Sequence, residues 1–444
     1  MNKTKQTDKI PSFDSSVDYI SVGLDVGADF TWMSIALPNK SFVGKPFKIV
    51  HSDAKSREAA IERIKEAQKL YSLKSRCFLE STGIYHIPLL YFLHDNGFVC
   101  ETINPIITKN STNWNVRKVH NDKLDSKKVA LIGLGNSLKT SLIPDDNICN
   151  LRNLVRDYYY FKDEQAAISL KLIAELKVSF PEYAGVFSKV TGKASLALLK
   201  KYPLASDILK APKDEVIKLI RSIVRFGDAY VEGKYEKLVS AARDAAIFGH
   251  AIQSNAVRIK AYIASYEEHQ KHLDSFMDAI KESVEALNGT AVYEQISLLQ
   301  TIRGIGFLSA VVLVAEMGDF SRFPSPRKLF AFFGMDPSVK DSGKFHGDQV
   351  HMSKRGSPLA RRILHMAAIN NLKVSRKTGD PVNPVIHSYY AAKCSGKKKK
   401  VAVGAVMHKI CNYVFAVLRD QKPYELITAE QHRKEYEMTR KKTA

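Results

Sequence analysis

The first 150 residues alternate short apolar runs with amphipathic stretches, a pattern typical of an α/β domain. Strand-like runs occur at residues 18–29, 31–37, 44–50, 76–80 and 98–103, and helical spacing occurs at 56–71, at 85–97 and from Asp122 onward. Three leading strands joined by tight turns are expected to be antiparallel, and the later strands to be parallel crossovers. This order favours a ribonuclease H-like (RuvC-like) fold over a doubly wound nucleotide fold, which alternates from its first strand.

Beyond residue 150 the strand pattern stops and the periodicity becomes helical. Nine positions in the almost glycine-free stretch 235–287 step alternately by four and three, and all but Gln270 are apolar: Ile259, Ile263, Tyr266, Gln270, Leu273, Met277, Ile280, Val284 and Leu287. This spacing is typical of a coiled-coil seam, in which one polar position helps to set the register. The buried face of a helical bundle gives the same pattern, so both interpretations stay open.

The last third of the chain is expected to be mainly helical. The segment 298–320 predicts a helix, a Gly-Ile-Gly turn and a second helix, similar to a helix-hairpin-helix. A glycine-punctuated loop at 336–357, a further helix, a basic loop "GKKKK" and an apolar helix follow, with a charged tail expected to be disordered. The chain is thus expected to be α/β plus all-α, with a RuvC-like domain at 1–150, a helical coiled-coil region at 151–290 and a mainly helical domain at 291–444.

The charge of the chain indicates the class of partner. Its 444 residues include 67 Lys and Arg against 46 Asp and Glu, giving a formal net charge of +21 and a pI of about 9.5. Clustered cations favour a polyanion such as nucleic acid through counterion release. A solubility charge or a basic tail is the alternative, but here the basic residues are spread through the whole chain.

The cysteines and the apolar runs bear on the compartment. Five cysteines stand singly with no C-x-x-C pair, which argues against a disulfide framework or a structural zinc and favours a reducing compartment. The polar N-terminus has no apolar signal-peptide core, and the longest apolar run, 308–315, is too short to cross a bilayer. We therefore expect a cytoplasmic protein with no membrane partner.

Four acidic residues are expected to meet at one edge of the predicted sheet. Asp25 lies in the first strand and Glu80 ends the fourth, while Asp122 and Asp125 open the last helix of the domain and share one of its faces. Carboxylates so placed repel one another unless a cation lies between them, and Mg²⁺, with Mn²⁺ as a substitute, prefers such oxygen ligands. Two such ions would clamp the attacking and leaving oxygens of a phosphodiester. When Asp122 and Asp125 are taken alone, helix N-terminal dipole compensation is the better explanation of the two, since Asp is favoured in first turns regardless of function.

Three motifs in the C-terminal third carry weaker information. The Gly-Ile-Gly turn would let backbone N–H groups approach phosphates, although any two helices need a turn. The "GKKKK" run is typical of non-specific backbone binding. Ser342 lies in the basic loop, and its position alone gives little reason to make it a nucleophile.

Taken together, these segments resemble the DEDD-type insertion-sequence transposases, a family of bridge-RNA-guided recombinases with a RuvC-like N-terminal domain and a C-terminal serine transposase domain. The matching segments cover both ends of the chain in the family's order: "VGLDVG", "FLESTGIY", "INP" followed by "NDKLDSKKVA", "LRNLVRDYYY", "FPEY", "LLQTIRGIGFLSAVVLVAEMGDFSRFPSPRKLFAFFGMDPSVKDSG" and "SKRGSPLARRILHMAA". The sequence differs from the usual pattern at Arg303, where Pro is usual, and at Asn121 and Ser126, where Thr and Ala are commoner. Its middle helical region is also longer than in compact members.

The resemblance implies roles that spacing alone does not. Asp25, Glu80, Asp122 and Asp125 look like the family's four Mg²⁺-binding acids, and Ser342 looks like the serine that forms a covalent phosphoserine link with DNA. It further implies that the acids and the serine come from different subunits, that dimers assemble into a tetramer, and that a structured guide RNA pairs with donor and target DNA. The expected function is therefore that of an insertion-sequence transposase or site-specific DNA recombinase.

Two other functions remain open from the sequence. A junction-resolving or RNA/DNA-hybrid nuclease would use the same four acids with water as the nucleophile. A non-catalytic nucleic-acid scaffold would use only the basic helices and the coiled coil.

Overall fold

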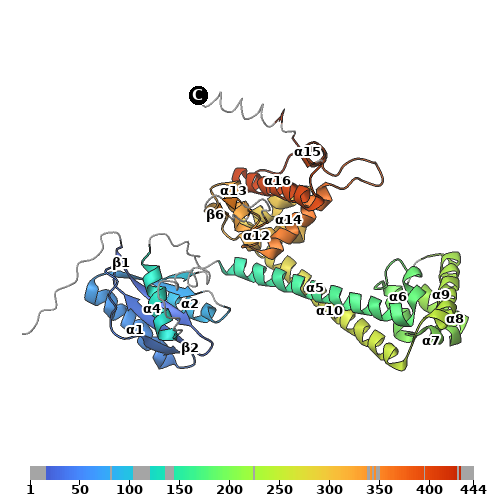
Figure 1. Ribbon diagram of the computed structural model, residues 1–444, viewed down its shortest axis with the longest axis horizontal. Helices are drawn as coiled ribbons and strands as arrows, with labels where there is room; N and C mark the ends of the chain where they lie inside the picture. Colours follow the sequence, from blue (N-terminus) through green and yellow to red (C-terminus); the bar gives the residue numbers. More distant parts are fainter. Residues whose placement is uncertain are drawn as a thin grey trace, which may run out of the picture. The chain divides into compact units, whose positions relative to one another are not determined.

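The protein is described by a computed structural model, which covers the whole chain except for a few segments (Figure 1). The described residues are 17–80, 83–103, 121–135, 145–223, 226–337, 341–342, 345–346, 351–394, 396–427 and 430–431. The chain divides into two compact units, Met1–Pro144 and Asp145–Ala444, and each is described by itself. The C-terminal tail expected to be disordered lies mostly outside the described residues.

The first unit is built on one mixed sheet of five strands. The strands are β1 (Tyr19–Val26), β2 (Phe30–Ala36), β3 (Phe47–Val50), β4 (Lys74–Glu80) and β5 (Val99–Ile103), and their order in the sheet is β3-β2-β1-β4-β5. β1 and β3 both pair with β2 antiparallel, whereas β4 pairs parallel with both β1 and β5. The structure confirms the predicted antiparallel start and parallel continuation. This arrangement is the one expected of a ribonuclease H-like sheet.

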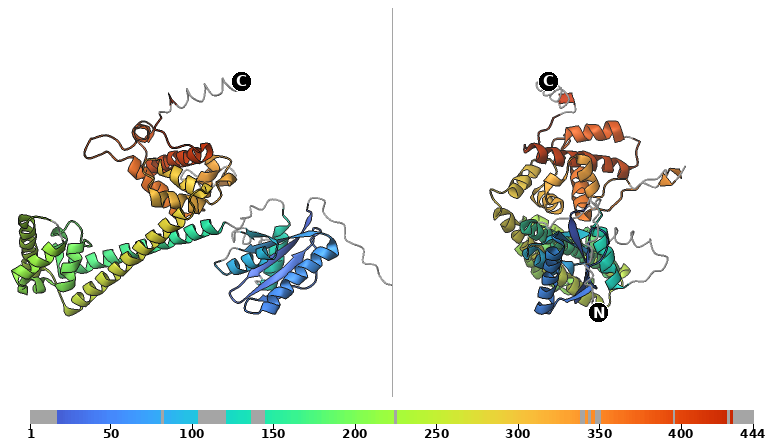
Figure 2. Two further views of the ribbon diagram at one scale, coloured as in Figure 1. Left: turned by 180° about the vertical axis from the view of Figure 1, so that it is seen from behind. Right: turned by 90° about the vertical axis from the view of Figure 1, so that its left-hand side faces the viewer.

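Helices cover both faces of this sheet (Figure 2). α1 (Ala54–Tyr71) and α2 (His86–Asp95) lie on one face and share a core with the apolar residues of the central strand. α4 (Asp122–Gly133) lies on the other face, where Ala130 packs against Ala36 of β2. The alternation of side chains along a strand puts Ile20, Val22 and Leu24 toward α1 and α2. The intervening positions of β1 therefore face α4.

α4 approaches the central strand so closely that only glycine fits between them. A Cβ atom at Gly23 would lie 2.1 Å from the backbone nitrogen of Ala130 and 2.4 Å from the carbonyl oxygen of Ser126. The missing side chain thus lets the helix backbone rest on the strand two residues before Asp25.

The second unit is almost entirely helical and contains two hydrophobic cores. Its helices are α5 (Asp146–Ser179), η2 (Pro181–Gly185), α6 (Lys193–Lys201), α7 (Ala205–Lys210), α8 (Lys213–Ile223), α9 (Asp228–Phe248), α10 (Gln253–Glu285), α11 (Ala291–Gln300), α12 (Phe307–Met317), η3 (Phe320–Arg322), α13 (Pro326–Phe332), α14 (Pro358–Asn371), α15 (Pro384–Cys394) and α16 (Lys399–Asp420). One core joins the C-terminal part of α5 and the N-terminal part of α10 to α6–α9. The other joins the opposite ends of α5 and α10 to α11–α16.

The seam predicted in the middle region lies on α10 and packs within one chain. α5 and α10 run side by side (Figure 1), and Ile259, Ile263, Leu273, Ile280 and Val284 of the seam are buried. The polar position is paired across the seam, since the amide nitrogen of Gln165 donates to the Gln270 side-chain oxygen at 3.0 Å. Within the described chain, the seam is thus an intramolecular helical hairpin, with α9 separated from α10 by a break at residues 249–252.

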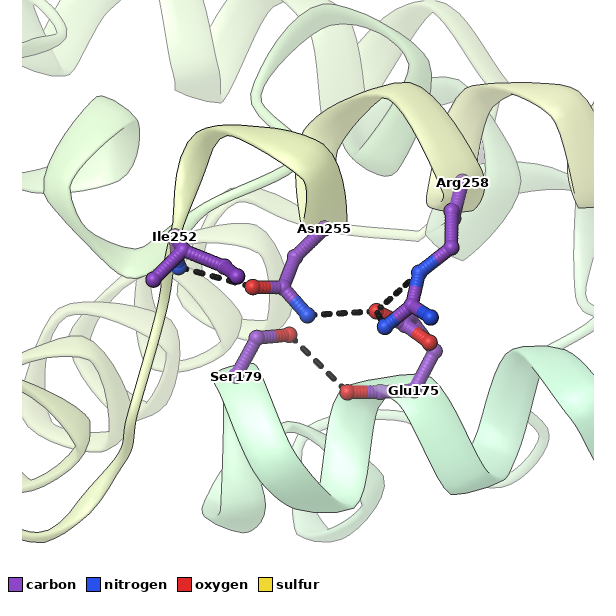
Figure 3. A network of polar contacts seen from close by, with 5 residues as sticks. All are labelled: Glu175, Ser179, Ile252, Asn255 and Arg258. Atoms are coloured by element: carbon purple, nitrogen blue, oxygen red, sulfur yellow. Dashed lines mark hydrogen bonds and ion pairs between the residues drawn. The ribbon is translucent and has the colours of Figure 1, made fainter.

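A polar network fastens the end of this helical hairpin (Figure 3). The side-chain oxygen of Asn255 accepts from the Ile252 N–H at 2.7 Å, and its amide nitrogen donates to the carboxylate of Glu175. Arg258 donates to the same carboxylate oxygen from two nitrogens, at 3.1 and 2.6 Å. Because Glu175 is buried, this pairing offsets the cost of removing its charge from water.

One helix of the second unit is long and apolar enough to cross a membrane by length and composition, a possibility that the apolar runs in the sequence did not show. This helix is α16, and 56% of its 18-residue apolar window is buried inside the protein. Its apolar residues pack in the core with α12 and α14. The core helix of a globular domain passes the same test, so this finding is weak evidence for a membrane span.

Candidate active site

The two strand acids lie side by side where β1 and β4 end. Glu80 is the last residue of β4 and Asp25 the last but one of β1. The parallel register pairs Leu24 with Leu79, so Asp25 and Glu80 are the next residues along the two neighbouring strands. Side chains alternate along a strand, which puts both acids on the face covered by α4. The carboxyl ends of the central strands thus carry the predicted acids.

α4 brings the other two acids to this edge. The helix begins at Asp122, its first turn contains Asp125, and the side chain of Asn121 caps it by accepting from the Lys123 N–H at 3.0 Å. The hydroxyl of Ser126 lies 2.8 Å from that of Ser34 on β2. The two departures from the family pattern in this segment therefore cap α4 and tie it to the sheet. Asp122 and Asp125 therefore lie where both predicted roles place them, in the first turn of a helix and at the edge of the sheet that carries the other two acids.

The pKa of Asp25 is affected by the other three acids. Burial raises the pKa of Asp25 to about 6, and the charges of Asp125, Asp122 and Glu80 add to the rise in that order. A carboxyl group is shifted in this way when removal from water and like charges both disfavour its ionised form. The structure thus brings the four predicted acids into one electrostatic cluster.

Lys128, which sequence reasoning missed, partly compensates this cluster. Its ammonium nitrogen lies 2.6 Å from a carboxylate oxygen of Asp125, one turn along α4, and its charge lowers the pKa of Asp25. A lysine at this spacing after an aspartate is common on any helix surface, so the sequence carried no specific signal.

The donor set suits a hard divalent cation. Carboxylate oxygens are the ligands that Mg²⁺ prefers, and the mutual repulsion felt by Asp25 is the condition that a bound cation relieves. In the described residues, no three His, Cys, Asp or Glu side chains are yet close enough together to hold an ion. Binding would therefore require the side chains to close around the ion and Asp125 to exchange its Lys128 partner.

Ser342 lies in the second unit, on a short β-hairpin. β6 (Asp341–Ser342) pairs antiparallel with β7 (Phe345–His346), and Ser342 is the partner of Phe345. Ser342 is the last residue of β6, and two residues separate it from β7 in the sequence. Its side chain lies outside the described part of the structure.

The base of this hairpin is fixed to the helical core. Pro337 and Met352 form an isolated antiparallel bridge, and the Ser353 N–H donates to the carbonyl oxygen of Asp336 at 2.7 Å. The hydroxyl of Ser353 also bonds to the carboxylate of Asp336. Sequence reasoning missed this pair because the two residues lie far apart in a loop that has no periodic pattern.

Arg361 holds the two sides of the hairpin base together from α14. Its guanidinium donates to the carbonyl oxygens of Phe333 and Gly356, at 3.0 and 2.6 Å. A Cβ atom at Gly356 would lie 1.9 Å from the carbonyl oxygen of Phe332, so the returning chain can pass only as glycine. The two segments that flank the hairpin in the chain are thus closely packed against each other.

The helix-turn-helix and the lysine run have structural roles of their own. α11 and α12 flank the Gly-Ile-Gly turn as predicted, and the side-chain amide of Asn371 donates to the carbonyl oxygen of Arg303 within that turn. The guanidinium of Arg303 donates to the carbonyl oxygen of Val382. Lys399 and Lys400 of the lysine run form the first turn of α16. Phosphate binding by either motif stays a prediction.

An ion pair between the half-exposed Arg156 and the buried Glu316 joins α12 to α5. The guanidinium of Arg156 donates to both carboxylate oxygens of Glu316, at 2.7 and 2.9 Å, and the Glu316 side chain is only 2% exposed. Bidentate pairing of this kind fixes the orientation of both partners.

Two family models match the chain, one from the first unit through α5 and the other in the C-terminal third. A transposase model of the DEDD type from IS110 elements matches residues 22–181, and a model described as transposase, IS116/IS110/IS902 family, matches residues 296–391. The first match contains the four acids, and the second contains the hairpin of Ser342.

Several proteins are similar to the chain over different lengths. The insertion element IS110 uncharacterized 43.6 kDa protein of Streptomyces coelicolor is 21% identical over 317 residues, which is 68% of this chain and 72% of that protein. The putative transposase y4qE of Sinorhizobium fredii is 24% identical over 35% of the chain and 45% of its own length. The pilin gene-inverting protein of Moraxella bovis is 26% identical over 38% of the chain and 51% of its own length. The chain therefore carries the DEDD-type transposase domain and the IS116/IS110/IS902 transposase domain of IS110-family insertion-sequence transposases.

Proposed function

We propose that this protein is a site-specific DNA recombinase that cuts and rejoins DNA at the ends of an insertion sequence. The observation that carries the proposal is the placement of two acids at neighbouring strand ends and two in the first turn of α4, where their charges raise the pKa of Asp25, in a chain of net charge +21. Acids gathered in this way serve phosphodiester chemistry, while the basic surface binds the backbone. The names of the relatives, which include a transposase and a gene-inverting protein, support DNA strand exchange rather than junction resolution.

Asp25, Glu80, Asp122 and Asp125 would hold the divalent cation, with Mg²⁺ as the proposed ion. When bound, such a cation polarises a phosphoryl oxygen and stabilises the negative charge of the transition state. The residues of the chain fix where this happens, because Gly23 and the Ser34–Ser126 hydrogen bond set the position of α4 on the sheet.

Ser342 is the proposed nucleophile. Its Oγ attacks the scissile phosphorus and forms a phosphoserine ester, while the bond between phosphorus and one deoxyribose oxygen breaks. The hydroxyl proton leaves the serine, and the departing deoxyribose oxygen takes up a proton to become a free hydroxyl. The ester conserves the energy of the broken bond, so the reverse attack by another DNA hydroxyl rejoins the strand.

We further propose that the acids and the serine that act together belong to different subunits. The acids lie on a rigid sheet in the first unit, and the serine lies on a hairpin in the second. A homodimer would form two composite sites, and two dimers in a tetramer would bring donor and target DNA together. A structured guide RNA that pairs with both DNAs and a cytoplasmic, nucleoid-associated location complete the proposal.

The covalent step can be tested directly by trapping. The full-length protein would be incubated with Mg²⁺ and labelled DNA that spans the two ends of its own element, together with RNA transcribed from the flanking non-coding DNA. A denaturing gel should show a protein–DNA adduct that resists boiling and disappears after protease treatment. Ser342→Ala should lose the adduct, whereas Ser338→Ala in the same loop should keep it.

The same experiment separates the alternatives. Normal strand exchange by Ser342→Ala would overturn the serine mechanism and favour water as the nucleophile. Full activity of Asp25→Ala would overturn any catalytic role for the acids. Equal adduct formation after the RNA is omitted would overturn guidance by RNA.

A further inference from the structure

Trp32 lies beside the four acids, although no sequence motif pointed to this residue. In the antiparallel register, Trp32 of β2 is the direct partner of Asp25 of β1. The side chains of directly opposite residues point to the same face, with Cβ atoms about 4.5–5.5 Å apart. Ser34, two residues further along β2, bonds to Ser126 of α4, which identifies this face as the one that carries the acids.

The indole of Trp32 is only partly buried and carries a cation. The ammonium nitrogen of Lys123 lies 4.7 Å from the centre of the ring. Lys123 follows Asp122 directly, and among the described residues it forms no ion pair. A flexible lysine that rests on an aromatic face contributes about 0.5–1 kcal/mol at an exposed site, so a competing partner can displace it.

An aromatic plane and an ammonium group next to the proposed phosphodiester-processing acids match the base and the phosphate of a nucleotide. Bases stack on aromatic side chains without regard to sequence, at about 1–3 kcal/mol per base, and Lys binds phosphate as a point charge. A tryptophan needed only for the core would pack its ring among apolar residues. Trp32 instead lies at the end of the sheet where charged groups gather.

We propose that Trp32 and Lys123 form a nucleotide-positioning site. The indole stacks on the base that adjoins the scissile phosphate, and the Lys123 ammonium leaves the ring to bind a neighbouring backbone phosphate. The stacked base fixes the strand, so the scissile phosphate lies against the four acids. Trp32 is a positioning residue for the proposed reaction, and this inference rests on the proposed function.

Tryptophan fluorescence tests the stacking directly, because the chain contains only two tryptophans, Trp32 and Trp114. The full-length Trp114→Phe variant, kept free of metal with EDTA, would be titrated with a single-stranded oligothymidylate. Stacking should quench the Trp32 emission, with the same midpoint as binding followed by fluorescence anisotropy. Binding by anisotropy without any change in Trp32 emission would overturn the proposal.

A thermodynamic cycle provides the second measurement. Trp32→Ala should weaken the binding of the oligothymidylate about 5- to 20-fold, and Trp32→Phe should restore it to within about 3-fold. An oligomer of the same length with abasic sites should show no further loss in Trp32→Ala, because the stacking partner is already gone. Equal losses for both probes, or no rescue by phenylalanine, would contradict base stacking.

The outcomes distinguish this inference from the function on which it rests. If the adduct forms normally but the Trp32 emission does not change on binding, the positioning site is contradicted and the proposed recombinase function stands. Quenching of Trp32 without any adduct would leave a nucleotide-binding site and remove the serine mechanism.

Discussion

The acid site and the serine hairpin differ in the elements that carry them and in the charge that those elements must hold. The four acids stand on two parallel strands and one helix, and α4 lies so close to the sheet that Gly23 has no room for a side chain. Ser342 lies on a pair of two-residue strands, and the residues that flank them in the chain form the Pro337–Met352 bridge. The first region gathers like charges and must resist their repulsion, whereas the second presents one small neutral group.

This difference indicates how the proposed chemistry is divided. A rigid scaffold is needed where carboxylates are held together, because burial and, after it, the repulsion of neighbouring acids both disfavour the charged form of Asp25 and raise its pKa. A neutral hydroxyl has no such electrostatic cost, so it can lie on a short hairpin such as β6–β7. The comparison predicts that packing defects are most damaging under the acids and that changes in the hairpin base affect the delivery of the serine more than the stability of the fold.

The largest effect is expected from Gly23→Ala. The added methyl group would lie 2.1 Å from the backbone of α4, so the helix must move away from the sheet. We expect the first unit to lose about 3 kcal/mol of unfolding free energy, together with most of its recombination activity. Urea unfolding followed by Trp32 fluorescence measures the loss.

Gly233→Ala is the matched control, since no atom lies within 4 Å of a Cβ at this helical position. Its stability is measured by far-UV circular dichroism, because both tryptophans lie in the first unit. We expect the second unit to keep its stability or to gain up to about 1 kcal/mol. Equal stability of the two variants would show that the close contact at Gly23 is not needed.

Gly356→Ala should have the next largest effect, and it should be confined to the second unit. The methyl group would lie 1.9 Å from the carbonyl oxygen of Phe332, which opens the base of the hairpin. We expect a loss of about 2 kcal/mol in the second unit and a slower formation of the serine adduct. Trp32 fluorescence should keep its wild-type unfolding curve, and a shift of that curve would contradict the separation of the two regions.

Asp25→Asn should abolish strand exchange but stabilise the metal-free protein. The pKa of Asp25 is about 6 in the fold and about 3.8 ordinarily, so the folded state holds the proton more tightly. Stability therefore falls as the pH rises from about 4 to about 6, and above this range the charged Asp25 destabilises the fold. Discounted for partial exposure, the cost is about 1–2 kcal/mol, which the neutral asparagine removes.

Thermal unfolding in EDTA at several pH values tests this sign. The difference between Asp25→Asn and wild type should be near zero below pH 4 and reach its full size above about pH 6.5. A variant that is less stable than wild type at pH 7.5 would show that the charged form of Asp25 does not destabilise the fold.

The smallest effect is expected at the Asp336–Ser353 hydrogen bond. Ser353→Ala and Asp336→Ala should each cost about 1 kcal/mol and slow adduct formation a few-fold, because the bond holds the hairpin base. In the double variant the two losses should not add, and the coupling should be about 1 kcal/mol. Fully additive losses would mean that the two side chains act independently.

Much of the first unit followed from the sequence because its signals are local. The apolar runs and the helical spacings predicted the five strands and their helices. The short link after the first strand predicted its antiparallel pairing, whereas ten residues, and not the expected tight turn, connect β2 to β3. The same order placed Asp25 and Glu80 at neighbouring strand ends. Ser342 could be named from family resemblance only, since a serine in an irregular loop has no periodic signal.

The sequence by itself thus determined the order of elements, the positive charge and the candidate acids. Tertiary structure decided what each residue faces. It showed that the seam of α10 pairs with α5 in the same chain, that Lys128 compensates Asp125, and that Trp32 stands opposite Asp25. These relations depend on register and on helix position, which are set by contacts between residues far apart in the chain and not by the pattern of any one segment.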